Sequence, residues 1–362
     1  MAKKRIGYYR DILTHPGEIL KEILDDRNIT QKELSTKIGY SEQQISRVIT
    51  GKNNISPDFA KLLEYALGIE IAFWLNLQTK YDIELLECDE LDSVTDEELS
   101  ISKTISKITK EFVSLGLIPD NVKKKELVIS LRKVFEIANL TLIPKMMPIG
   151  CYRAAETVKT DIYILFAWHK LCDIIASRNA VDIPLDTDLL KSSLSVIKSL
   201  MFEEPSVMVS ELHLMFAKCG ISFNLVPHFT GAPVQGFIKI ENNGSANLSM
   251  TIRGAWAGIF WFTLLHEIGH ILNGDIDGQF TDYVKEDSHR EREADKFATN
   301  TLIDPDLYER FISNRDFSEA SVVNFASINK VPTFIVVERL QRERCIPYNS
   351  LLKYKLTYKW AT

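Results

Sequence analysis

Residues 15–51 read HPGEILKEILDDRNITQKELSTKIGYSEQQISRVITG, and this stretch decides the fold of the first part of the chain. Apolar residues recur every three to four positions in three short runs, which predicts three amphipathic helices. Thr30 begins a capping box and Ser41 stands before the next run, so both predict helix starts. Gly39 and Gly51 follow the second and third runs, where glycine typically ends a helix. The second and third runs are therefore predicted to form two short helices joined by a turn that contains Gly39.

Two further helical runs follow, SPDFAKLLEYAL at residues 56–67 and AFWLNLQTKYDIELL at residues 72–86. Together with the first three they predict a compact five-helix domain, which we place at residues 1–87. The whole chain carries a net charge of −6, but up to Lys80 there are 12 basic and 10 acidic residues. Because charge acts locally, the mildly basic N-terminal domain remains compatible with nucleic-acid binding.

The spacing across residues 30–51 is typical of a helix-turn-helix that reads DNA, in which the second helix enters the major groove. Glutamine can pair with adenine, and arginine or lysine can hold guanine or phosphate. A helical hairpin with an ordinary polar face is the alternative, and glutamines would also suit a surface that docks proteins. The predicted DNA-contacting residues are Gln31, Ser41, Gln43, Gln44, Ser46, Arg47 and Lys52.

Residues 15–82 resemble the HigA-type antitoxins of the XRE family of helix-turn-helix regulators. The resemblance rests on the HPGE start, the Q-K-E-L and S-x-x-x-I-S-x-x-x-x-G blocks, and the FWLNLQ-x-x-YD ending. It implies a homodimer bound to a double-stranded DNA operator, often autorepression, and in some cases a toxin as protein partner.

The rest of the chain changes character twice. An acidic stretch is expected to be a linker at residues 88–103, with an exposed helix start as the alternative for residues 88–100, and residues 104–219 are expected to form a helical middle region. After Gly220 the segments ISFNLVP, VQGFIKI and ANLSMTI are short, β-prone and separated by turns, which predicts a small antiparallel sheet. The fold class is therefore mainly α with a small sheet (α+β), with a core domain at residues 220–312 and a C-terminal tail at residues 313–362.

The run GIFWFTLLHEIGHIL contains His266, Glu267 and His270 in an HExxH pattern. Two histidines four residues apart lie on one helix face and can hold one Zn²⁺, while the glutamate between them can take a proton from an attacking water. The longer apolar segment from Gly254 to Leu272 is about long enough to span a membrane, but three ionisable residues in one half argue against that. Histidines that only satisfy hydrogen bonds in a core are the other alternative.

A catalytic zinc site of this kind needs a third protein ligand. The HExxHxxGxxH pattern is absent because position 276 is Ile, so the ligand is expected from the later run HREREADKFATNTLI. At 100° per residue, Glu291 falls about 50° from the centre of the apolar face of that helix and Glu293 about 110° away. Glu291 is the predicted ligand, and Glu293 remains the alternative. Asp295 is placed to accept the other N–H of a zinc-binding histidine.

The blocks FTLLHEIGH and EREADKFATNTLIDP, with the strand pattern ahead of them, resemble the ImmA/IrrE family of gluzincin-type metallopeptidases over residues 220–305. The resemblance implies a zincin-like domain in which His266 and His270 bind zinc, Glu267 is the general base and a later glutamate is the third ligand. Members of the family commonly cleave helix-turn-helix repressors. The ending LIDP departs from the more usual LLMP, which bears on specificity more than on metal binding.

Composition agrees with a folded protein, since 45% of the 362 residues are hydrophobic and 25% are charged. The five cysteines form no CxxC pair, and no apolar segment follows the basic N-terminus, so we expect a cytoplasmic chain without disulfides or a membrane anchor. The leading hypothesis is a transcriptional regulator fused to a zinc-dependent metallo-endopeptidase that cleaves itself or a partner regulator. The alternative is a non-catalytic DNA-binding regulator whose zinc is structural or sensory.

Overall fold

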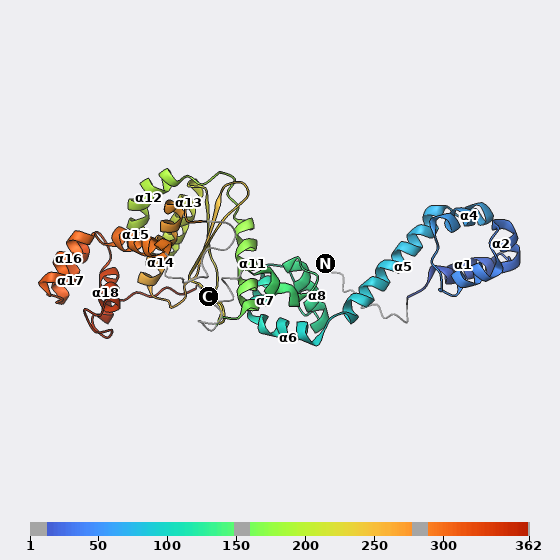
Figure 1. Ribbon diagram of the computed structural model, residues 1–362, viewed down its shortest axis with the longest axis horizontal. Helices are drawn as coiled ribbons and strands as arrows, with labels where there is room; N and C mark the ends of the chain where they lie inside the picture. The colour runs from blue at the N-terminus through green and yellow to red at the C-terminus, as the bar shows by residue number, and fades with distance from the viewer. Residues whose placement is uncertain (1–12, 148–159, 277–288, 361–362) are drawn as a thin grey trace. The chain divides into compact units, whose positions relative to one another are not determined.

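The computed structural model describes residues 13–147, 160–276 and 289–360 (Figure 1). The chain divides into two compact units. The first unit comprises Met1–Leu99 with Val122–Ser130, and the second comprises Ser100–Asn121 with Leu131–Thr362.

The first unit contains the five helices predicted for the N-terminal domain, and all five are confirmed. They are α1 (Pro16–Asp26), α2 (Gln31–Ile38), α3 (Glu42–Ile49), α4 (Pro57–Leu67) and α5 (Ile71–Asp92). Thr30 and Ser41 close capping boxes at the starts of α2 and α3. Gly39 and Gly68 end α2 and α4 in the left-handed conformation, with φ of 71° and 67°. The capping residues therefore fix the helix ends, and a core that includes Trp74 holds the helices together.

The sequence HPGE begins α1, and its residues act together. The backbone N–H of Gly17 donates to His15 Nδ1 at 2.9 Å, and the N–H of His15 donates to Glu18 at 3.2 Å, which completes a capping box. Gly17 also lies directly against α3, because a Cβ at this position would lie 1.9 Å from the carbonyl oxygen of Val48. The approach of α1 to α3 thus depends on the missing side chain.

The segment 88–103, expected as a linker, is largely helical. Helix α5 continues to Asp92, and α6 (Asp96–Thr104) begins four residues later. The first turn of α6 carries three acidic residues, where negative charge is favoured by the helix dipole. The acidic run that indicated a linker is therefore divided between the end of α5 and the charged start of α6, with Cys88 and Ile101 buried on either side.

The second unit contains most of the remaining elements. They are α7 (Ser106–Ser114), α8 (Lys124–Phe135, which starts in the first unit), α9 (Ile143–Met146), α11 (Ile162–Arg178), α12 (Thr187–Ser199), α13 (Pro205–Lys218), β1 (Ile221–Leu225), β2 (Gly236–Ile240), β3 (Ala246–Met250), α14 (Ala257–Asn273), α15 (His289–Leu302), α16 (Pro305–Asn314), α17 (Glu319–Ile328) and α18 (Thr333–Arg342), with short 3₁₀ helices at Leu140–Leu142, Leu200–Phe202 and Leu352–Tyr354. The mainly helical α+β class is confirmed.

The sheet is mixed, so the prediction of an antiparallel sheet was wrong. Its strand order is β1-β3-β2, with β3 antiparallel to β2 and parallel to β1. The prediction assumed that strands pair in chain order. Instead β3 takes the centre, and two reversals of the chain return it to the direction of β1.

Helices cover both faces of this sheet, and side-chain alternation along the strands explains which residues face which layer (Figure 1). Phe223 of β1 packs against Phe216 of α13 at 5.2 Å between ring centroids. Phe237 of β2 faces Trp168 of α11 at 6.2 Å. Helix α14 packs on the α13 side, where Trp261 and Leu264 are fully buried. The HExxH helix therefore belongs to the main core of this unit.

The C-terminal residues are attached to the start of α14. Trp256 at its N-cap position provides no side-chain cap, and Glu338 of α18 instead accepts from the N–H of Gly258 at 3.4 Å. Burial raises the pKa of Glu338. Further along, Trp261 Nε1 donates to the hydroxyl of Tyr358 at 3.0 Å. The tail predicted at residues 313–362 thus provides a cap to the HExxH helix.

Replacing Glu338 by alanine is expected to lower the free energy of unfolding of the second unit by about 1 kcal/mol, the usual cost of losing a helix cap. Thermal unfolding followed by circular dichroism would measure the change, with the exposed Glu309→Ala as control. Equal melting temperatures for the two variants would contradict the capping role.

Among the described residues, no single helix is long and apolar enough to cross a bilayer, although α17 and α18 together pass that test as a pair bent by 115°.

Candidate functional site

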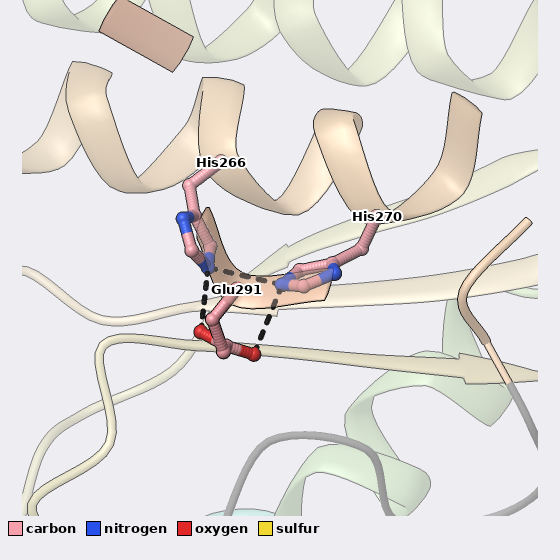
Figure 2. A group of neighbouring side chains, drawn as sticks. All are labelled: His266, His270 and Glu291. Carbon is pink, nitrogen blue, oxygen red and sulfur yellow. Dashed lines mark hydrogen bonds and ion pairs between the residues drawn. The ribbon is translucent and has the colours of Figure 1, made fainter. Parts of the chain in front are cut away.

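Three side chains from two helices converge at one point of the second unit. Figure 2 shows the imidazoles of His266 and His270, from α14, pointing toward the carboxylate of Glu291, from α15. The two Nε2 atoms are 3.0 Å apart, and each lies 3.4 Å from one oxygen of Glu291. These are the residues that the sequence pattern assigned to a metal site.

The separation of these atoms can be compared with the requirements of a zinc ion. Nitrogen and oxygen ligands lie about 2.0–2.2 Å from Zn²⁺, so two ligands at a tetrahedral angle are about 3.3 Å apart. The observed 3.0–3.4 Å lies close to that value. Two histidines and one glutamate also form a donor set typical of zinc sites with an open position. The residues therefore fit zinc.

The structure brings Glu291, and not the alternative Glu293, to the two histidines. Glu293 instead lines a surface pocket with Asn273 and Lys296. Hydrogen bonds from His266 and then His270, opposed by partial burial, lower the pKa of Glu291 to about 2. The carboxylate is therefore ionised at neutral pH, as a metal ligand must be.

Each histidine also has an acidic neighbour at its other ring nitrogen. Nδ1 of His266 lies 2.8 Å from Asp295, the residue proposed for this role from the sequence. Nδ1 of His270 lies 3.4 Å from Asp275, which the sequence analysis missed. The available signal was an aspartate directly after the helix-ending Gly274. Such carboxylates fix the ring orientation and leave Nε2 as the metal-binding atom.

The glycine inside HEIGH explains how α15 reaches the histidines. A Cβ at Gly269 would lie 3.1 Å from the ring of Phe297 and 3.2 Å from Cα of Ala294. The two helices thus pack at close range because Gly269 has no side chain and Ala294 a small one. This packing positions Glu291 one turn earlier on α15.

The predicted general base, Glu267, is 4% exposed and points toward the sheet. A Cβ at Gly236 of β2 would lie 2.2 Å from its Oε1, so the carboxylate occupies the space above this glycine. Gly236 therefore limits where the carboxylate can lie. The sequence analysis did not single out Gly236, because the neighbouring residues form no motif that distinguishes it from other glycines.

An apolar groove of 640 Å³ begins one helical turn before His266. Its lining includes Ile259 and Phe262 of α14, and the ring of Phe262 is 6.2 Å from that of His266. Arg342 of α18 lies over the same Phe262 ring at 4.5 Å. An apolar groove thus adjoins the candidate metal site, as a substrate site requires.

The predicted DNA-contacting residues lie in the first unit, mostly on α3 and its ends. Gln31 and Ser46 are half-buried, and the other five are exposed. Ser41 and Gln44 bond each other in the capping box, and Arg47 Nε donates to Asn53 at 3.3 Å. Part of the hydrogen-bonding capacity of Ser41 and Gln44 is thus used within the helix.

Comparison with known proteins supports the prediction of a helix-turn-helix in the N-terminal domain. A helix-turn-helix family model, HTH_3, matches residues 20–74. The chain is 32% identical over 68 residues to an uncharacterised HTH-type transcriptional regulator, YddM, of Escherichia coli K12, covering 19% of this chain and 72% of the relative. It is 33% identical over 76 residues to virulence-associated protein I of Dichelobacter nodosus, covering 21% and 70%.

Two solved structures are also similar, each over 23% of the chain. One is an addiction module antidote protein of the HigA family from Coxiella burnetii, 28% identical, covering 23% of this chain and 96% of that one with a TM-score of 0.21. The other is a putative antidote protein of a plasmid maintenance system from Nostoc punctiforme, 35% identical, covering 23% and 97% with a TM-score of 0.20. The family match ends at residue 74, far before His266, His270 and Glu291.

Proposed function

Because this chain belongs, through its N-terminal domain, to the HTH_3 family of helix-turn-helix regulators, we propose that it is a DNA-binding transcriptional regulator of HigA type that also carries a zinc-dependent metallo-endopeptidase centre. The convergence of His266, His270 and Glu291 on one point carries the second half of the proposal. The likeness to HTH-type regulators carries the first.

In the proposed complex with DNA, α3 lies in the major groove. Its buried residues Ile45 and Val48 attach it to the domain, which leaves Gln43 and Arg47 on the exposed side. A homodimer would present two such helices to a palindromic operator, and a toxin would be a further partner. The modest positive charge of the domain makes each single contact weak, so affinity depends on the dimer.

Arg47→Ala and Gln43→Ala test this interface separately. If Arg47 contacts phosphate, we expect Arg47→Ala to weaken binding to the upstream region of its own gene, and to weaken binding to other DNA sequences to the same extent. The slope of log affinity against log salt concentration should then fall by about 1. Gln43→Ala should relax discrimination at one base pair, at a cost of about 1–3 kcal/mol. A gel-shift titration at several salt concentrations measures both effects. Exposed Glu22→Ala on α1 is the control, and equal affinity of all three variants and wild type would contradict the assignment.

Zinc would be held by His266, His270 and Glu291, and when bound it would polarise a scissile carbonyl and acidify the attacking water. Asp295 and Asp275 orient the two imidazoles through Nδ1. The groove beside Phe262 would receive a side chain of the peptide and exclude water from it.

Glu267 performs the proton transfers in this proposal. Its carboxylate takes a proton from the attacking water and then delivers it to the leaving nitrogen of the peptide bond. Burial against Gly236 restricts the carboxylate to a narrow range of positions, so little reorganisation is needed during the reaction. The substrate would be this chain itself or a partner regulator.

The metal assignment predicts the metal content of purified protein. Wild type should contain about one zinc per chain, and His266→Ala should lose it because only two protein ligands remain. His213→Ala is the matched control, since His213 lies on α13 and bonds the carbonyl of Val209. Inductively coupled plasma mass spectrometry after dialysis gives the stoichiometry. Equal zinc in wild type and His266→Ala would refute the site.

A further inference from the structure

A second cavity lies on the face of the sheet opposite α14, beneath α11. Its volume is 550 Å³, and its lining includes side chains from all three strands. Ser222 of β1 and Lys239 of β2 are both paired in register with Asn247 of the central strand β3. Because directly opposed side chains share a face, these three form one polar row across the sheet.

This face of the sheet is polar although it is buried. Ser222, Asn224, Asn247 and Ser249 are each 7% exposed or less. Asn224 Nδ2 donates to Ser222 Oγ at 3.0 Å, and Ser249 Oγ donates to Asn247 Oδ1 at 3.0 Å. Apolar side chains would pack a helix against a sheet without the desolvation cost of these groups. The buried polar network therefore indicates a binding site for a polar ligand.

One donor of the network is unsatisfied. Asn247 is fully buried, and within the described part of the chain its Nδ2 has no hydrogen-bond partner. A buried donor without a partner destabilises the fold, because it has lost its hydrogen bonds to water and gained none in exchange. Since Asn247 belongs to the lining of the cavity, an acceptor oxygen of a ligand would remove this cost.

Charged groups beside Asn247 define what else the ligand must carry. Lys239 Nζ pairs with Asp173 at 3.0 Å and with Glu241 at 3.4 Å, and Lys170 pairs with Glu136 at 3.2 Å. All five line the cavity, so three carboxylates face two ammonium groups. A simple anion would have to compete with Asp173 and Glu241 for Lys239. A ligand that brings its own ammonium group balances the excess negative charge.

We propose that this cavity binds a small zwitterion of the amino-acid class. Its carboxylate accepts from Asn247 Nδ2, and its ammonium group donates to Asp173 and Glu241. The apolar part of the lining, which includes Ile174 and Val181, receives an apolar side chain. This ligand site is distinct from the proposed DNA-binding and zinc sites.

Isothermal titration calorimetry of the full chain with the amino acids, one at a time, tests the proposal without DNA or zinc. At least one apolar amino acid should bind. Asn247→Asp keeps the acceptor used by Ser249 but removes the donor, and Asp173→Asn removes one partner of the ammonium group; each should raise Kd at least about tenfold, a loss of one charge-assisted hydrogen bond. Exposed Asp188→Asn on α12 should leave Kd unchanged.

Circular dichroism of each variant separates loss of the ligand from loss of the fold. If Asn247→Asp does not fold, the half-exposed Asp173→Asn still tests the site. Binding of a neutral sugar or a nucleoside in place of amino acids would overturn the ligand class. Absence of any bound amino acid, or binding that neither variant weakens, would overturn the proposal as a whole.

Discussion

Gly17→Ala is expected to weaken operator binding by at least about 100-fold, equivalent to about 3 kcal/mol. The added methyl group would lie 1.9 Å from the carbonyl oxygen of Val48, and a backbone atom cannot rotate away as a side chain can. Either α1 or α3 must move. Helix α3 carries the proposed base-reading residues. A shift of α3 therefore moves these residues away from the base edges in the major groove, even if the domain still folds.

The matched control for this change is Glu22→Ala, which adds no atom and lies on the exposed side of the same helix. Gel shifts give the affinities, and circular dichroism gives the melting temperature of each variant. Wild-type affinity in Gly17→Ala would mean that α1 and α3 can separate without consequence, which would contradict the contact that the structure shows.

Local rules accounted for the helices and for most residues of the candidate metal site. HExxH fixes two histidines on one face because the helical repeat is 3.6 residues, and the same periodicity favoured Glu291 over Glu293. Thr30 and Ser41 could be recognised as caps because a capping box lies within four residues. These features need no information about distant parts of the chain.

Long-range contacts account for what could not be predicted. Glu338 caps a helix that begins 80 residues earlier, and no sequence pattern links it to Gly258. The strand order β1-β3-β2 is set by pairing between segments that are distant in the sequence, β1 and β3, so the short β-prone runs predicted the strands but not their pairing. Gly236 is an ordinary glycine in sequence, and only the fold places Glu267 above it.

Glu267→Gln is expected to abolish peptide cleavage while leaving zinc bound. Glutamine keeps the shape of the side chain but cannot take the proton of the attacking water, and loss of a general base costs about 10²–10⁴ in rate. Zinc content should stay at the wild-type value, since Glu267 is not among the three converging residues. Mass spectrometry of a proteome-derived peptide library incubated with each protein measures cleavage without knowledge of the substrate. Glu293→Gln is the matched control.

Gly236→Ala provides an independent version of the same prediction, because it alters no ionisable group. Its methyl group would lie 2.2 Å from Oε1 of Glu267, so the carboxylate must rotate away from its position against β2. If that position serves proton transfer, cleavage falls with zinc content unchanged, as in Glu267→Gln. Cleavage that survives both changes would show that another group acts as the base. Zinc in wild type without cleavage of any peptide would instead favour a regulator whose zinc is structural or sensory.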